Sequence, residues 1–242
     1  MKRPLDKASH EQPQSKLPRT NTTPSDNIPI EATSKTPPTT TATATKMGLT
    51  FYYHPQSTAC ATAAALAELN LPNVERKLTK LGAEGTRTTE YLTKVNPNGT
   101  VPTLVLEDGT SIWESAAIAI YLGETYGVER GLYPAAGTSQ RAEAIKWIVW
   151  ANTVLSAAAS KLEEPATAEK GKTGVNAALK IIDDSLSKKS PYLLGEKYTL
   201  VDAHVYEFVV WVSMCSIDIK PYTHMNKWFA TLGERPALKS VE

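Results

Sequence analysis

The stretch from Asn96 to Tyr121 has the most readable pattern of apolar and polar positions in the chain. Val101 to Leu106 is a short apolar run rich in β-branched residues, and Asp108-Gly109 is a strong hairpin-turn signal. Ser111 to Trp113 can pair back as a second strand. A helix follows at once, with Ser115 as its predicted cap and an apolar face at helical spacing. The pattern predicts strand, turn, strand and helix.

The preceding part of the chain alternates strands and helices. The pattern predicts a strand over Leu49 to Tyr53, a helix over Ser57 to Leu69, a strand over Asn73 to Leu78 and a short helix over Thr88 to Val95. Together with the central stretch, the element order is β-α-β-α-β-β-α. This is the order of a thioredoxin-like domain, and it ends near Tyr126.

Strand signals give way to helices after the turn-rich connector Leu132 to Gly137. The predicted helices are Ser139 to Leu162, Glu169 to Ser187, Leu200 to Cys215 and Tyr222 to Gly233. Thr199 and Asp202 form a capping-box pattern at the start of the third of these helices. The sequence therefore predicts an all-α second domain packed against the first.

Residues 1–46 differ in composition from the rest of the chain. They contain no Phe, Trp or Tyr, but hold 10 Thr and 7 of the 16 prolines. Such a segment buries too little apolar surface to offset its ordering entropy, so we expect a disordered Thr/Pro-rich tail. Its Lys2-Arg3 and Lys16 to Arg19 can be read as a split nuclear signal, but interspersed acidic residues favour a solvated tail. The expected domains are then residues 47–127 and 128–242.

Charge and composition exclude several classes of protein. The chain has 26 basic and 25 acidic residues, so nothing calls for nucleic acid or an anionic membrane as partner. No apolar run approaches the roughly 18 residues that span a bilayer, and no signal-peptide pattern follows the basic start. We expect a soluble cytoplasmic protein. Cys60 and Cys215 are too few for a disulfide framework and are expected to be buried filler, and the histidine spacing predicts no metal site.

Two features of the central stretch point to the binding of a small peptide. Pro102 cannot donate to a β-ladder, so it marks a sheet edge, a strand start or a cis bond. A cis bond would turn the backbone of Val101 outward, where it can pair with a peptide. The helix start at Glu114-Ser115 offers unpaired N–H groups to a carboxylate. The same small peptide could be held at its middle and at one end.

The segment NPNGTVPTLVLEDGTSIWESAAIAIYL resembles the glutathione-binding half of the thioredoxin-like domain in cytosolic glutathione S-transferases, near their theta, delta and beta classes. The later segments YLLGEKYTLVDA and ERPAL are similar to the helical domain of the same family. The resemblance implies a two-domain transferase fold and conjugation of glutathione, as co-substrate, to a hydrophobic electrophilic small molecule. It also implies a homodimer, and roles in detoxification and in secondary metabolism both fit.

The resemblance also assigns site residues. It implies that the hydroxyl of Ser57 activates the glutathione thiol, with Thr58, or neither residue, as the alternative. The main chain of Val101, set by Pro102, would pair with the cysteinyl part. Glu114 would meet the γ-glutamyl ammonium, and Ser115 would hold the γ-glutamyl carboxylate.

The sequence departs from the family pattern at three positions. Gly99 stands where delta-type enzymes have a histidine that reaches the glycyl end, and Ala116 stands where many members have arginine. Ser156 occupies the approximate position of a beta-class histidine near the sulfur. The acceptor site is expected between the first helix and the long later helices. The candidate lining residues, which fit an interdomain core equally well, are Trp147, Trp150, Val154, Trp211 and Met214.

Two other functions remain open from sequence. The fold also serves in non-catalytic interaction modules, as found in translation elongation factor complexes, and the predicted tail fits that reading. A glutathione-dependent isomerase or dehalogenase would share the co-substrate and differ only in the acceptor site.

Overall fold

The computed structural model describes residues 48–189 and 191–241. The predicted tail, residues 1–46, lies outside the described residues. No helix in these ranges is both long enough and apolar enough to cross a bilayer.

A four-stranded mixed sheet forms the base of the first domain. Its strands are β1 (Leu49–Tyr53), β2 (Val74–Leu78), β3 (Thr103–Val105) and β4 (Ser111–Trp113). They lie in the order β2-β1-β3-β4, with β1 parallel to β2 and the other two pairs antiparallel. β3 is shorter than predicted because Pro102, which has no N–H for the ladder, precedes it through a cis peptide bond.

The helices of the first domain follow the predicted order with different starts. They are α1 (Ala59–Leu69), a 3₁₀ turn (Gly82–Glu84), α2 (Thr89–Lys94) and α3 (Ser115–Leu122), which continues into a π-helical turn (Gly123–Gly127). The predicted start of the first helix at Ser57 is wrong by two residues, since Thr58 occupies the N-cap position. Ser115 is the first residue of α3 and not its cap, because Glu114 holds the N-cap position.

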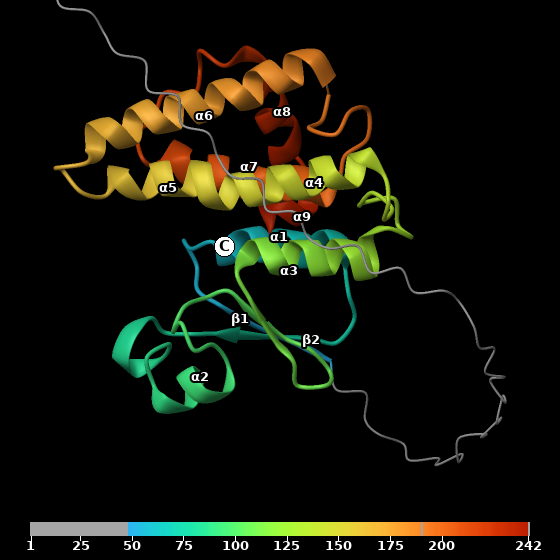
Figure 1. Cartoon of the computed structure of the whole chain (residues 1–242), viewed down its shortest axis with the longest axis vertical. Coiled ribbons are helices and arrows are strands. Elements are labelled where there is room, and N and C mark those ends of the chain that lie inside the picture. Colours follow the sequence, from blue (N-terminus) through green and yellow to red (C-terminus); the bar gives the residue numbers. More distant parts are fainter. Residues whose placement is uncertain (1–47, 190, 242) are drawn as a thin grey trace, which may run out of the picture. The chain divides into compact units, whose positions relative to one another are not determined.

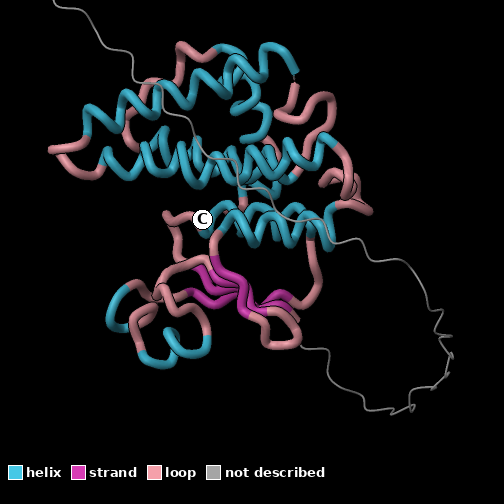
Figure 2. The backbone as a smooth tube through the Cα atoms, in the orientation of Figure 1, coloured by secondary structure: helices cyan, strands magenta, loops and turns pink. Residues whose placement is uncertain are grey.

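The first hydrophobic core lies between the sheet and the helices α1 and α3. Phe51 and Leu104 from neighbouring strands meet Leu66 of α1 and Ile118 of α3, all at most 3% exposed. In Figures 1 and 2, α1 and α3 lie between the sheet and the later helices. The small side chains along α1, mostly alanine, let α1 pack against α7 on its other side.

The second domain is all-helical, as predicted, with more segments than the sequence pattern indicates. Its elements are α4 (Ser139–Trp150), a π-helical turn (Ala151–Leu155), α5 (Ser156–Ala159), a 3₁₀ turn (Ser160–Leu162), α6 (Ala168–Lys189), α7 (Leu200–Met214), α8 (Thr223–Gly233) and α9 (Pro236–Lys239). The single predicted helix over Ser139 to Leu162 is interrupted by the π-helical turn, and α9 was not predicted.

A buried carboxylate, that of Asp202, caps the start of helix α7. Asp202 is fully buried, and its oxygens accept from the N–H of Thr199 at 2.9 Å, the N–H of Leu193 at 2.9 Å and Nε1 of Trp228 at 3.1 Å. The predicted capping box is confirmed. Because these donors come from the preceding loop and from α8, Asp202 also joins three segments of the domain.

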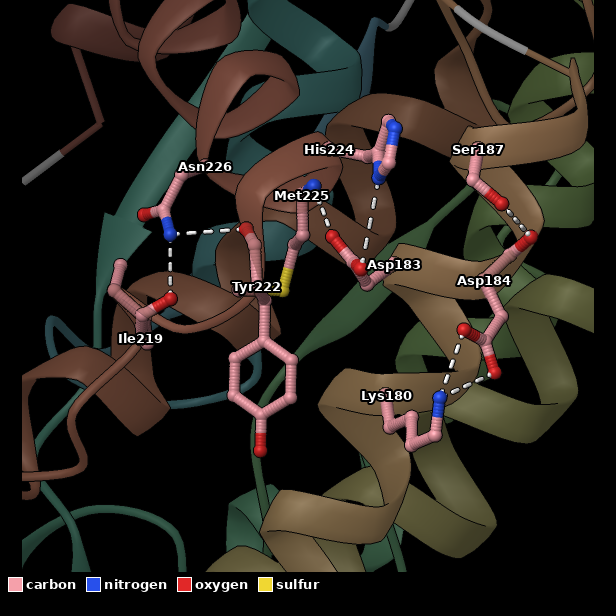
Figure 3. Close-up of polar contacts among 9 residues, drawn as sticks. All are labelled: Lys180, Asp183, Asp184, Ser187, Ile219, Tyr222, His224, Met225 and Asn226. Atoms are coloured by element: carbon pink, nitrogen blue, oxygen red, sulfur yellow. Dashed lines mark hydrogen bonds and ion pairs between the residues drawn. The ribbon is translucent and has the colours of Figure 1, made fainter.

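Helix α8 is capped by a side chain from another helix. Oδ1 of Asp183, on α6, accepts from the N–H of Met225 in the first turn of α8 at 2.9 Å (Figure 3). Asn226 donates its amide to the carbonyl of Tyr222 at 2.9 Å. The bond from Met225 satisfies an N–H that a helix N-terminus leaves unpaired, and it joins α6 to α8.

An ion pair ties α1 to the loop before α9. Arg235 makes two hydrogen bonds to the buried carboxylate of Glu68, with Nε–Oε1 at 2.7 Å and Nη2–Oε2 at 2.9 Å. The guanidinium lies 3.5 Å from the ring centroid of Tyr198, whose hydroxyl donates to the same carboxylate at 2.9 Å. The planar guanidinium therefore fixes the loop before α9 against the first domain.

Candidate active site

Sheet register brings the predicted site segments to one edge. Tyr52 of β1 pairs with Thr103 of β3, and Thr103 pairs with Trp113 of β4. One step beyond this row, β1 reaches its last residue, Tyr53, while β3 has not begun and β4 has ended. The turn with Ser57, the segment before β3 and the start of α3 consequently leave the sheet side by side. Since neighbouring strands lie about 4.8 Å apart, the outer two segments are roughly 10 Å apart at the sheet.

The turn between β1 and α1 fixes the hydroxyl of Ser57. Its Oγ donates to the carbonyl of His54 at 2.7 Å and accepts from the N–H of Ala59 at 3.2 Å. The carbonyl of Ser57 accepts from the N–H of Cys60 at 3.0 Å. Gln56, just before it, has a φ of +54°, a conformation that is uncommon for residues other than glycine. Ser57 is partly exposed, so its hydroxyl lies at the entrance of α1 and borders solvent.

Thr58 and Cys60 share this turn. The hydroxyl of Thr58, also partly exposed, makes no hydrogen bond to any described residue. Cys60 and Cys215 are both partly exposed, so the prediction of two buried filler residues is wrong. Burial raises the pKa of the Cys60 thiol, and the charge of Glu207 raises it further. This thiol is therefore held in its protonated, less nucleophilic form.

The loop before β3 is held by a buried amide. Asn96 is fully buried, and its Nδ2 donates to the carbonyl of Thr100 at 3.0 Å. Gly99 has a φ of +63°, and a Cβ there would lie 2.9 Å from the carbonyl oxygen of Thr86, so the tight loop needs glycine. The N–H and carbonyl of Val101 make no hydrogen bond to any described residue. They are free to pair with a ligand backbone.

Glu114 and Ser115 lie at the start of α3 with different exposure. Glu114 is exposed and has a φ of +71°, a strained conformation of the kind that clusters at functional sites. Ser115 is only 2% exposed, and its Oγ accepts from Nδ2 of Asn152 at 2.6 Å. A ligand can meet only a small part of Ser115, so Glu114 offers the larger contact surface.

Asn152 and His204 approach the site from the second domain and were not predicted as site residues. Asn152 lies in the π-helical turn after α4, and its Oδ1 is 2.7 Å from Nε2 of His204 on α7. Nothing in the local sequence marks Asn152. His204 did carry a signal, since it lies in a mostly apolar helix, where a polar residue must find a partner.

The candidate acceptor lining is dispersed. Trp147 and Trp150 pack edge to face, with ring centroids 5.2 Å apart, and line a hollow of about 390 Å³ together with Ile181 and Lys188 of α6. Residues of the β1–α1 turn do not line this hollow. Met214 is 71% exposed at the end of α7. The two tryptophans therefore face α6 instead of forming the expected lining beside α1.

Comparison with known protein families agrees with the two-domain fold. Residues 60–125 match the glutathione S-transferase N-terminal domain, and residues 147–236 match the glutathione S-transferase C-terminal domain. Glutathione S-transferase GstB of Escherichia coli (strain K12) is 30% identical over 158 residues, which cover 61% of this chain and 75% of GstB. The chain belongs to the glutathione S-transferase family.

Solved structures show the same architecture. A ternary complex of BphK, a bacterial glutathione transferase, aligns at 28% identity with a TM-score of 0.70, covering 79% of this chain and 96% of BphK. A glutathione transferase homologue from Lodderomyces elongisporus, solved with two glutathione molecules per subunit, aligns at 22% identity with a TM-score of 0.74 and covers 79% and 96% of the two chains. At that identity the second comparison shows the fold alone.

Proposed function

We propose that this protein is an active glutathione transferase that joins the thiolate of glutathione to an electrophilic small molecule. The sulfur of glutathione forms the new bond to the electrophilic carbon, and the leaving group departs with the electrons of the bond that breaks. The thiol proton passes to solvent before attack. Ser57 is the proposed thiolate donor, and Val101, Pro102, Glu114 and Ser115 form the proposed glutathione site.

The observation that carries this proposal is the convergence of three chain segments at one edge of the sheet. An extended tripeptide is about 10 Å long, which matches the roughly 10 Å between the outer two segments. In the proposed pose the γ-glutamyl end lies at Glu114 and Ser115, and the cysteinyl backbone pairs with the free groups of Val101. The sulfur then points towards the turn of Ser57.

The required pKa change is within reach of the groups present. A free thiol has a pKa of about 8.5, so a pKa lower by about two units makes the thiolate the main form at pH 7. This change corresponds to about 2.7 kcal/mol. A hydrogen bond to a charged group contributes about 1.5 to 3 kcal/mol. One hydroxyl therefore supplies most of the effect, and the dipole of α1 supplies the remainder.

Ser57 must give up an internal hydrogen bond to do this. Without a ligand its hydroxyl donates to the carbonyl of His54 at 2.7 Å. Breaking a neutral hydrogen bond costs about 1 kcal/mol, which is less than the gain from a charged acceptor. The N–H of Ala59 continues to donate to Oγ, so the oxygen keeps its place while the hydrogen turns. Thr58, whose hydroxyl has no such bond, is the alternative donor.

The experiment that tests the proposal compares variants of three neighbouring residues. Conjugation of glutathione to chlorodinitrobenzene is measured for Ser57→Ala, Thr58→Val and Cys60→Ala. We expect Ser57→Ala to lower kcat/KM by about tenfold to a thousandfold, as losing a charged hydrogen bond in the transition state predicts. We also expect Ser57→Ala to raise the pKa of the thiol of bound glutathione. This pKa is measured from the ultraviolet absorbance of the thiolate as the pH is changed. Thr58→Val and Cys60→Ala leave both values nearly unchanged. Loss only in Thr58→Val moves the role to Thr58, and loss only in Cys60→Ala places the protein in a thiol-exchange class.

We also propose that the protein acts as a homodimer in the cytoplasm on a hydrophobic electrophile. Two-fold pairing is the common assembly of soluble homo-oligomers. Two unpaired cysteines fit the reducing cytoplasm, where glutathione is the main thiol. Detoxification and secondary metabolism are both consistent with this chemistry.

A further inference from the structure

A line of hydrogen bonds runs from the second domain to the proposed glutathione site. Asn152 Nδ2 lies 2.6 Å from Ser115 Oγ, and Asn152 Oδ1 lies 2.7 Å from His204 Nε2. Ser115 and His204 are 2% and 1% exposed, and Asn152 is partly buried. These residues come from α3, from the π-helical turn Ala151–Leu155 and from α7. The bonds therefore connect both domains at one site.

The chemistry of the groups decides which atom donates and which accepts in the hydrogen bond between Asn152 and His204. A carboxamide oxygen only accepts, so His204 Nε2 must carry a hydrogen if Oδ1 of Asn152 faces it. Burial lowers the pKa of His204 to about 3, so the ring is neutral and Nδ1 is then the unprotonated nitrogen. Nδ1 is buried without a partner among the described residues. The opposite amide orientation would place a buried N–H there, and orphaned buried N–H groups are rarer than orphaned acceptors.

The hydroxyl hydrogen of Ser115 is also fixed by its bond to Asn152. Its Oγ accepts from Nδ2 of Asn152, so the hydroxyl hydrogen is left to donate to another group. The N–H groups at the start of α3 and this hydroxyl then present donors only, which suits an anion such as a carboxylate. A hydroxyl without the Asn152 donor could rotate and offer a lone pair instead.

The π-helical turn explains how Asn152 reaches this position. The N–H of Ser156 bonds to the carbonyl of Ala151, five residues earlier, so the turn is one residue wider than an α-helical turn. A wide turn changes which side chains face the neighbouring helices, and such turns are frequent at functional sites. Thr153, in the same turn, is exposed and bonds back to the carbonyl of Val149, so it faces away.

We infer that Asn152, oriented by His204, is a positioning residue that turns the hydroxyl of Ser115 towards the ligand and makes the site selective for the γ-glutamyl carboxylate of glutathione. This inference rests on the proposed function. Asn152 itself does not touch the ligand. It acts through Ser115, and its effect is confined to the part of the ligand that Ser115 meets.

The test uses two ligands that differ by this carboxylate. Calorimetry gives the Kd of the full chain for glutathione and for 4-aminobutyryl-cysteinylglycine, which lacks the carboxylate. The variants are Asn152→Ala, the isosteric Asn152→Asp, Ser115→Ala and the matched control Thr153→Ala in the same turn. Thermal unfolding confirms that each variant is folded.

We expect Asn152→Ala to weaken glutathione binding about tenfold. The reason is that the hydroxyl of Ser115 is then no longer held in the orientation that donates to the charged carboxylate. Asn152→Asp weakens it more, because its carboxylate takes the Ser115 hydrogen and repels the ligand. Neither change alters binding of the analogue, and Thr153→Ala alters neither ligand. Adding Asn152→Ala to Ser115→Ala causes no further loss, since the two act as one unit.

Two results would overturn the inference. If Asn152→Ala and Asn152→Asp bind glutathione as the unchanged protein does, Asn152 has no positioning role. If they weaken both ligands equally, Asn152 supports the fold and not the carboxylate contact. Failure of the unchanged protein to bind glutathione would instead refute the proposed function, and the inference with it.

Discussion

Glu207 is a buried acid whose replacement by glutamine should stabilise the protein at neutral pH. It lies on α7, is 8% exposed, and makes no hydrogen bond or ion pair with any described residue. Burial raises its pKa from the usual 4.5 to about 7. The charged form is therefore disfavoured in the folded state, since no donor compensates for lost hydration.

The size and sign of the effect follow from the two pKa values. As the pH rises above about 4.5, the unfolded chain loses the proton of Glu207, while the folded protein keeps it until the pH is near 7. The unfolded state is therefore favoured increasingly over this range, and the penalty stays constant above it. At about 1.4 kcal/mol for each pH unit between the two values, the total is about 3 kcal/mol. Glu207→Gln remains neutral and avoids this penalty.

Denaturant unfolding of both proteins between pH 4 and 8.5 checks this prediction. The free energy of unfolding of Glu207→Gln minus that of the unchanged chain should rise by about 3 kcal/mol between pH 4.5 and 7 and then level off. His204 titrates in both proteins and cancels in the difference. Glu129→Gln, at an exposed position, is the control and should give a nearly flat difference. A flat curve for Glu207→Gln, or one that falls with pH, would refute the reasoning.

Three further predictions concern stability, the N-terminal segment and assembly. Arg235→Ala should lower the free energy of unfolding by about 3 to 5 kcal/mol, because it removes the cation from the buried carboxylate of Glu68 and leaves that charge with the hydroxyl of Tyr198 alone, whereas the exposed Lys239→Ala should change it by less than about 1 kcal/mol. A comparable loss in both variants would contradict the buried-pair account. A chain that begins at Met47 should keep its melting temperature and conjugation rate, because the preceding residues contain no aromatic residue and too few apolar side chains to form a core. A large fall in either would mean that they pack on the domain. Light scattering at micromolar concentration should give the mass of a dimer, and a monomer mass would contradict the proposed assembly.

Local sequence patterns predicted the order of elements and the segments that meet at the site. Alternation in β1 and the apolar face of α1 identify these elements, and the signal at Asp108-Gly109 places the hairpin between β3 and β4. The capping box at Thr199 was also predictable, because both partners lie within one turn of helix. Such features depend on residues that are close in sequence.

Features that depend on contacts between distant segments were not predictable. The bond from Asn152 to Ser115 joins residues 37 positions apart, through a π-helical turn that no local signal marks. Cys60 was expected to be buried filler, but it is the second residue of α1 and its side chain is partly exposed. The burial of Glu207 depends on the packing of α7 against α1, which no single-helix pattern specifies.

Binding to glutathione is the central claim, and retention on immobilised glutathione tests it most directly. The full chain is passed over glutathione coupled to a resin and, as a control, over the same resin carrying cysteine. The account predicts retention on the glutathione resin alone and elution by free glutathione. Passage of the folded protein through both resins without retention would contradict the account and favour a non-catalytic interaction module.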